Sequence, residues 1–176
     1  MKLIKYSLII LVLNVPVLKS QCLEDLEYAC DTVKTKNNRS NYTEYYKQES
    51  YQDAYEPWKW LVDNAPKSTK NLYIHGPKIL RALIEKTENE IEKQKLIDLL
   101  IILYDYRLEH YPGKEGYVLA LKGKDMYKYC ASTIEELNKC RSVLKKSFLL
   151  DGLSSTATTI NYYFNVSLKL YQKKRT

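Results

Sequence analysis

The chain has 176 residues, enough for one ordinary domain or for a few repeats of a larger array. Hydrophobic residues make up 45% and charged residues 28%, while glycine and proline number only 5 each. A sheet-rich domain normally needs more turn residues, so we expect a soluble all-α fold with long helices and short connections. The formal charge is +7, but residues 1–20 contain three lysines and no acidic residue, which leaves +4 for the remainder. This mild excess is a poor basis for nucleic-acid binding.

Residues 1–20 are predicted to be a signal peptide. Two lysines lie near the start, an apolar run over residues 7–13 follows, and Ser20 offers a small residue at a plausible cleavage point. The apolar run is too short to span a bilayer comfortably, and an uncleaved membrane anchor is the alternative. We therefore expect residues 21–176 to form a single exported domain, periplasmic or associated with the cell envelope.

About seven helices are expected after the signal peptide. The first covers residues 22–35, and the polar stretch KTKNNRSNYTE, centred on residues 37–41, is expected to be a loop. The remaining helices are expected at about 42–64, 69–86, 88–110, 117–130, 134–150 and 156–172. Thr133 and Glu136 fit a capping box at the start of the helix over 134–150. The apolar run LIDLLIILY has nine residues, which indicates a core helix and not a membrane span.

The stretch AYEPWKWLVDNAP contains both tryptophans of the chain. Ala54, Trp58 and Leu61 follow one another at steps of four and three, so on a helix they share one face. Pro66 lies five residues further on, where it ends the helix. We expect Trp58 to pack in the core and Trp60 to be half exposed.

The same spacing returns twice further along the chain. It recurs at Leu100, Tyr104, Arg107 and Pro112, and again at Cys140, Leu144, Ser147 and Gly152. The three starts are 46 and 40 residues apart, and each frame closes an apolar helix. Three matches in order indicate an internal repeat.

The segments that follow the first two frames also resemble each other. They carry a common pattern at Leu72, Gly76 and Ile79, and at Leu119, Gly123 and Met126. A glycine inside a helix costs up to about 1 kcal/mol relative to alanine. That cost is tolerated where a neighbouring helix must approach closely, so we expect close helix packing at both glycines.

These patterns resemble tetratricopeptide repeats over roughly residues 50 to 170. The resemblance implies antiparallel helix pairs stacked as an α-solenoid, although Arg107 and Ser147 stand where the repeat has alanine. The spacing also exceeds the usual 34 residues. The phrases AYEPWKW, YIHGPKIL and LYDYRLEHYPGK are similar to the N-terminal part of exported repeat proteins from Bacteroidetes. Those proteins are usually longer, which implies a short or truncated member.

The four cysteines are Cys22, Cys30, Cys130 and Cys140. The first two are eight residues apart in a segment expected to be helical, about 12 Å of rise, which exceeds disulfide reach. The last two flank a predicted turn and form the better pair, but buried free thiols are the favoured interpretation. No cysteine pair has the short spacing of a zinc site, so we expect no metal.

No catalytic motif is recognisable. The nearest constellation is YDYRLEH, in which Asp105 and Glu109 are four residues apart and close to His110. An acid–base or metal group is conceivable there, but an exposed helix end with mixed charges is the favoured interpretation. We therefore expect neither enzymatic activity nor a cofactor.

The resemblance implies a protein-interaction scaffold whose concave face binds a partner protein or an extended acidic peptide. The positions expected to line this groove are Lys70, Tyr73, Arg81, Lys124, Tyr127, Lys128 and Tyr163. Their role as ordinary surface residues is the alternative. Charge reversal at Arg81 and Lys128 is expected to weaken binding without lowering the melting temperature. The second function considered is recognition of anionic glycan or phospholipid at the cell envelope through lysines, including the terminal QKKRT.

Overall fold

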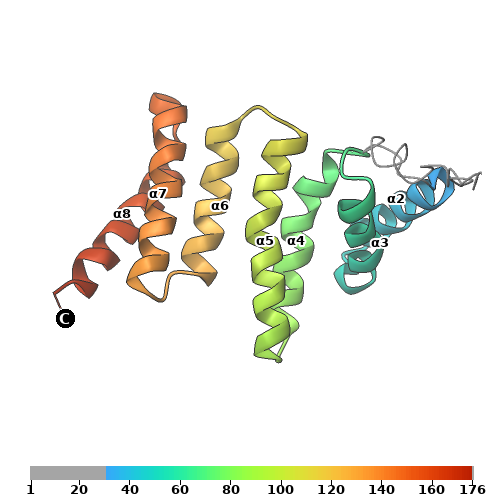
Figure 1. Ribbon diagram of the computed structural model, residues 1–176, viewed down its shortest axis with the longest axis horizontal. Coiled ribbons are helices and arrows are strands. Elements are labelled where there is room, and N and C mark those ends of the chain that lie inside the picture. The colour runs from blue at the N-terminus through green and yellow to red at the C-terminus, as the bar shows by residue number, and fades with distance from the viewer. Residues whose placement is uncertain (1–30, 176) are drawn as a thin grey trace, which may run out of the picture.

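The computed structural model describes residues 31–175, and seven α-helices form a row across it (Figure 1). The helices are α2 (Thr32–Lys47), α3 (Tyr51–Asn64), α4 (Asn71–Lys86), α5 (Glu90–His110), α6 (Glu115–Tyr129), α7 (Ile134–Asp151) and α8 (Ala157–Lys173). A short 3-10 turn, Gly152–Ser154, links the last two, and no strand occurs within residues 31–175. The predicted all-α fold is confirmed. The predictions for the signal peptide, for residues 22–30 and for the two cysteines there lie outside the described residues.

The prediction of a polar loop at residues 37–41 is wrong, because this stretch lies inside α2. Asp31 caps the helix by accepting a hydrogen bond from the Lys34 amide at 2.8 Å. Only Thr35 and Tyr42 are buried along α2, so most of its side chains face solvent. The polar composition therefore marks the exposed face of a helix that packs against α3.

The single helix predicted over residues 42–64 is also wrong, because it is two helices. The chain turns at residues 48–50, where Glu49 adopts a left-handed backbone with φ 59°. The Glu49 carboxylate pairs with Lys78 of α4 at 3.1 Å. This turn folds α2 back against α3.

The predicted bounds of α4 to α8 are confirmed to within two residues. The predicted capping box of α7 is present: the Glu136 amide donates to Thr133 Oγ1 at 3.1 Å, and the Thr133 amide donates to Glu136 Oε2 at 2.8 Å. Hydrogen bonds from the Ser132 hydroxyl and the Thr133 amide lower the pKa of Glu136 to about 2. The start of α7 is thus fixed by its own side chains.

All nine helical positions of the three repeat frames are buried, as the spacing predicted. Trp58 is fully buried, and its Nε1 donates a hydrogen bond to the Leu72 carbonyl oxygen at 2.8 Å. Trp60 is half-buried, also as predicted. The frames therefore mark the inward faces of α3, α5 and α7.

The two repeated glycines lie where helices approach closely. A Cβ atom at Gly76 would come within 2.5 Å of Trp58 Cζ2 and 2.7 Å of Leu103 Cδ2. A Cβ atom at Gly123 would overlap the Leu144 side chain. Both sites therefore exclude any larger residue unless the neighbour moves.

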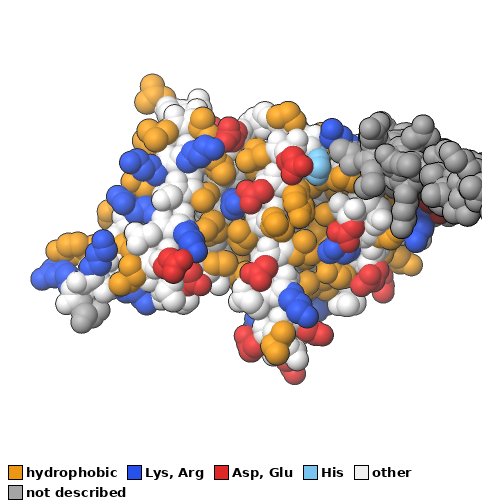
Figure 2. Space-filling model, viewed as in Figure 1, with side chains coloured by type: hydrophobic (Ala, Val, Ile, Leu, Met, Phe, Trp, Pro, Cys, Tyr) orange, Lys and Arg blue, Asp and Glu red, His pale blue; other side chains and the backbone are white. Residues whose placement is uncertain are grey.

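Each helix packs chiefly against its neighbours along the chain, and α6 also contacts α8. The buried apolar residues form two clusters, one within α2 to α5 that reaches Val118 of α6, and one within α6 to α8. On the face seen in Figure 2, charged side chains of both signs are interspersed with hydrophobic ones. None of the described helices combines the length and the apolar character needed to cross a membrane.

Candidate functional site

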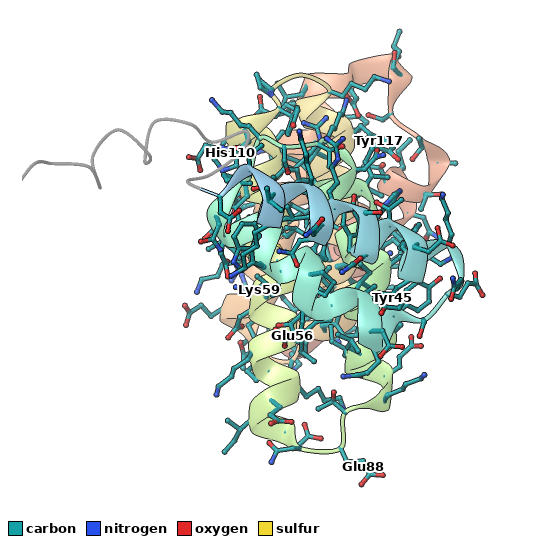
Figure 3. The ribbon with its side chains drawn as sticks, turned by 90° about the vertical axis from the view of Figure 1, so that its right-hand side faces the viewer. Tyr45, Glu56, Lys59, Glu88, His110 and Tyr117 are labelled. Carbon is teal, nitrogen blue, oxygen red and sulfur yellow. The ribbon has the colours of Figure 1, made fainter. Side chains whose placement is uncertain are left out.

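The start of α4, the end of α5 and the start of α6 lie on the same side of the row of helices (Figure 1). A cavity of about 250 Å³ lies there and is lined by residues at and near these helix ends. In the end-on view of Figure 3, His110 and Tyr117 mark this end of the helices, opposite Glu88. The charged residues of its lining are Lys70, Arg107 and Lys114, and no Asp or Glu side chain of residues 31–175 joins them. We call it the Arg107 cavity. Within the described part of the chain, its lining therefore carries positive charge and no negative charge.

Arg107 is the buried cation of this cavity. Its side chain comes from the last turn of α5, the residue is 6% exposed, and its Nη1 has no hydrogen-bond partner among the described residues. The Tyr111 ring centre lies 5.9 Å from the guanidinium carbon. Burial lowers the pKa of Arg107, and the interactions that oppose this shift come from tyrosines and not from a carboxylate. A buried charge without a counter-charge is costly, so this arrangement favours an anion.

Two helix N-termini also meet at the cavity. Lys70 and Lys114 are the N-cap residues of α4 and α6, and neither gives its helix a side-chain capping bond. The first turn of α4 lines the cavity with Tyr73, and that of α6 lines it with Tyr117. A helix N-terminus carries a partial positive charge, and oxygen-bearing side chains are normally preferred at the N-cap. Lysines at both caps add to the positive potential.

Three tyrosines form the aromatic part of the wall. The hydroxyl of Tyr73 donates to the Pro66 carbonyl oxygen at 3.0 Å, and that of Tyr104 donates to Asp125 Oδ2 at 2.6 Å, so both rings are held in place. Burial raises the pKa of both hydroxyls, which keeps them protonated. Tyr117 also lines the cavity and is 53% exposed. The rings of Tyr73 and Tyr104 are therefore fixed by hydrogen bonds, while the ring of Tyr117 is accessible to solvent.

A second cavity of about 200 Å³ shares Tyr117 and Leu121 with the first. Its charged lining residues are Lys124 of α6 and Asp151 at the end of α7, and the first turn of α8 contributes threonines. We call the two adjoining cavities the groove. Together they follow α6 from its first turn towards α8.

The structure brings three of the seven predicted groove residues to this groove. Lys70 and Tyr73 line the Arg107 cavity, and Lys124 lines the second cavity. Tyr127 instead packs edge-on against Tyr162, with ring centres 5.6 Å apart. The last tyrosine, Tyr163, lies under the Arg141 guanidinium at 5.6 Å and lines neither cavity.

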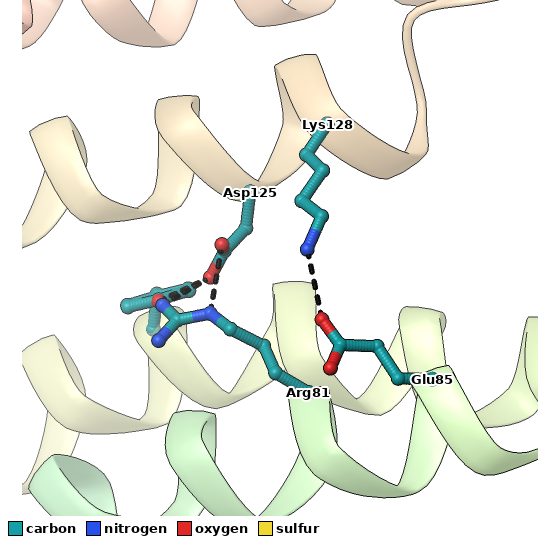
Figure 4. A network of polar contacts seen from close by, with 5 residues as sticks. Arg81, Glu85, Asp125 and Lys128 are labelled. Atoms are coloured by element: carbon teal, nitrogen blue, oxygen red, sulfur yellow. Dashed lines mark hydrogen bonds and ion pairs between the residues drawn. The ribbon is translucent and has the colours of Figure 1, made fainter.

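The remaining two predicted residues are engaged with acidic partners (Figure 4). Arg81 Nε and Nη2 donate to the two oxygens of Asp125 at 3.0 and 2.8 Å, and Asp125 is 1% exposed. Lys128 pairs with Glu85 at 3.2 Å on the surface. Because Tyr104 also bonds to Asp125, this buried network joins α4, α5 and α6 and fixes one wall of the Arg107 cavity. Arg81 thus has a structural contact that the sequence did not reveal.

The residues of YDYRLEH point in different directions. Tyr104 and Arg107 are buried, whereas Asp105 is exposed and pairs with Lys122 of α6 at 2.6 Å. The His110 ring lies 6.0 Å from the Tyr73 ring. Within residues 31–175, no three His, Cys, Asp or Glu side chains converge as metal ligands would.

Cys130 and Cys140 are both free thiols in the structure. Of the two alternatives, the structure therefore has free thiols and not the disulfide. Burial raises their pKa values to about 11 and about 12. Neither thiol is poised as a nucleophile near neutral pH.

Arg107, Lys114 and Tyr117 are the residues of the site that the sequence did not assign to binding. Arg107 had one signal, since it stands where the repeat has alanine and so places a charge at a buried position. Lys114 and Tyr117 had none, because their part in the site depends on which helix ends meet.

Comparison of the chain with protein-family models, with curated proteins and with solved structures gave no match. The assignment of the site therefore depends on its own geometry.

Proposed function

We propose that the protein is an exported, non-enzymatic helical-repeat scaffold whose groove binds an extended acidic segment of a partner protein. The three repeat frames and the packing of successive helices support a tetratricopeptide-like solenoid, a class of fold that presents extended binding surfaces. Export rests on the charge and hydropathy pattern of residues 1–20.

The observation that carries the proposal is the groove formed by the two adjoining cavities. Among residues 31–175, its charged lining consists of the cations Lys70, Arg107, Lys114 and Lys124 and the carboxylate of Asp151. The shared wall contains the exposed ring of Tyr117, which offers apolar area to an extended chain. An extended peptide rises about 3.3 Å per residue and its alternate side chains point to the same face, so side chains two or more residues apart can face the groove together. Carboxylates on that peptide pair with the cations.

Binding of a fluorescein-labelled decaglutamate peptide at low salt, followed by fluorescence anisotropy, tests the proposal. We expect the double variant Lys70→Glu and Lys124→Glu to lose most of the binding. The matched control is Lys145→Glu combined with Lys86→Glu, two exposed lysines outside the groove that give the same change in charge. Equal losses in both double variants would show that only net charge attracts the peptide, and the groove would then not be the docking site.

One observation favours the second candidate, contact with an anionic phospholipid surface. Residues 152–176 contain four basic and no acidic residues. On α8, Ile160, Phe164, Leu168 and Tyr171 are exposed at steps of four, four and three, and so form one apolar face. A basic helix with an exposed apolar face suits the interface of an anionic membrane.

Co-sedimentation with phosphatidylglycerol vesicles, compared with phosphatidylcholine vesicles, tests this candidate. Phe164→Ser combined with Leu168→Ser is expected to release the protein from anionic vesicles and to leave decaglutamate binding unchanged. Equal sedimentation with both vesicle types, or none with either, excludes the membrane role.

A further inference from the structure

We propose that the Arg107 cavity is a site for a phosphate monoester, which it binds in preference to a carboxylate. This inference names the ligand chemistry of one end of the groove and rests on the groove being a binding surface. It follows from the number of cations, from their positions on three helices and from the buried, unpaired state of Arg107.

The first step concerns Arg107 itself. A guanidinium that is 6% exposed has lost most of its hydration, and its Nη1 makes no hydrogen bond within the described part of the chain. The equivalent inward position holds Leu61 in the first frame and Ser147 in the third, and both are fully buried and uncharged. An arginine at this position destabilises the unliganded protein, and an anion in the cavity removes that cost.

The second step concerns charge. Lys70, Arg107 and Lys114 give the cavity three positive charges, and the N-termini of α4 and α6 add partial positive charge. A carboxylate brings one negative charge and two oxygens, whereas a phosphate monoester brings close to two charges and three acceptor oxygens near neutral pH. Three acceptors match three cations that approach from three helices. Helix N-termini are also established binding sites for phosphate groups, because backbone amides and the helix dipole both favour the anion.

The third step concerns what carries the phosphate. The rest of the lining is aromatic or aliphatic: Tyr73, Tyr104 and Tyr117 are the aromatic residues, and Ile74, Val118 and Leu121 are the aliphatic ones. A volume of about 250 Å³ holds a phosphate group and part of its carrier. The carrier is therefore an apolar or ring-bearing group, either a side chain of the bound segment or a small phosphate ester.

Small probes test the site without any peptide, so this test is independent of decaglutamate binding. Phenyl phosphate, inorganic phosphate and benzoate are titrated into the full-length protein by calorimetry near neutral pH, in a buffer of low ionic strength. Phenyl phosphate and benzoate share the ring and differ in charge. We expect phenyl phosphate to bind roughly tenfold or more tightly than benzoate, and inorganic phosphate to lie between them. Equal affinity for phenyl phosphate and benzoate overturns the proposal.

Two variants separate a ligand-binding role of Arg107 from a structural one. Arg107→Met is expected to abolish phenyl phosphate binding while the melting temperature of the unliganded protein stays the same or rises, because a buried unpaired charge is removed. Phenyl phosphate is expected to raise the melting temperature of the wild type only. A lower melting temperature in Arg107→Met together with retained binding overturns the proposal.

Lys114→Gln keeps the test decisive if Arg107→Met does not fold, because Lys114 is exposed. This variant is expected to weaken phenyl phosphate several-fold and benzoate less. The control is Lys145→Gln, an exposed lysine outside the cavity, which is expected to change neither affinity. Unchanged affinity in Lys114→Gln contradicts the proposal.

The source of the phosphate is distinguished by comparing a phosphotyrosine-containing peptide with free phenyl phosphate. Tighter binding of the peptide assigns the site to a side chain of the partner.

Discussion

Trp58 and Trp60 stand two positions apart on α3, yet their surroundings differ. Trp58 is fully buried and its indole nitrogen bonds to the Leu72 carbonyl oxygen, whereas Trp60 is half-buried with Lys34 Nζ 5.0 Å from its ring centre. We expect Trp58→Ala to reduce the free energy of unfolding by about 3–5 kcal/mol, as for large aromatic residues removed from a core. Trp60→Ala is expected to cost clearly less. Urea melts of both variants measure the difference, and equal losses contradict the burial of Trp58.

Gly76 provides a second test at the scale of one residue. Alanine is the better helix former by up to about 1 kcal/mol, but its Cβ would lie 2.5 Å from Trp58 Cζ2. Overpacking of this kind typically costs about 1–3 kcal/mol, so we expect Gly76→Ala to destabilise the protein despite its helix propensity. In a Trp58→Leu background the same substitution is expected to cost less, because the clashing ring is gone. A double-mutant cycle by urea denaturation measures this coupling, and additive effects would show that the contact is unimportant.

At the scale of the element, whether a helix could be predicted from the sequence depends on how many of its residues are buried. The helices α4 to α8 were predicted because their apolar residues recur at helical spacing. The helix α2 was missed because only Thr35 and Tyr42 are buried along it, so its sequence resembles a loop. The Arg107 cavity could not be predicted, since it arises where the ends of three helices meet. Of the residues in this cavity, Arg107 was marked in the sequence as a charged residue at a position expected to be buried. That observation did not indicate a binding function.

The capping box of α7 gives a prediction for one helix. Thr133→Ala removes the bond to the Glu136 amide and is expected to cost about 1 kcal/mol, typical of a lost N-cap. Circular dichroism during urea denaturation measures the loss. Ser154→Ala serves as the control, because Ser154 is an exposed hydroxyl residue outside the helix caps.

The Glu136 carboxyl adds a pH dependence to the same element. Its pKa falls from an ordinary 4.5 to about 2, because Ser132 and Thr133 donate hydrogen bonds to the ionised form. A lowered pKa in the folded state means that the stabilisation is complete above pH 4.5 and is lost as the pH falls towards 2. Glu136→Gln is expected to remove this part of the acid sensitivity. Melting temperatures of both proteins between these pH values test it, and parallel curves would contradict the assignment.

At the scale of the whole molecule, the Asp125 network joins α4 and α5 to α6. Asp125 is 1% exposed and accepts hydrogen bonds from Arg81 and Tyr104, so its loss leaves the partly buried guanidinium of Arg81 without a counter-charge. We expect Asp125→Asn to cost about 3 kcal/mol, at the lower end for a broken buried pair because Arg81 is partly accessible. For the same reason, charge reversal at Arg81 is now expected to lower the melting temperature. Thermal melts measure both, with Glu85→Gln as the exposed control.

Because α3 contains both tryptophans, tryptophan fluorescence, excited at a wavelength that the tyrosines do not absorb, reports on only one of the two hydrophobic clusters. Circular dichroism, in contrast, reports on every helix from α2 to α8. The two signals therefore observe different parts of the same denaturation. Coincident transitions would show that the row of helices unfolds as one cooperative unit. If ellipticity is lost at lower urea than the fluorescence change, helices other than α3 unfold first and the surroundings of the tryptophans stay folded longer. The position of two side chains thus makes the cooperativity of the array measurable without any added label.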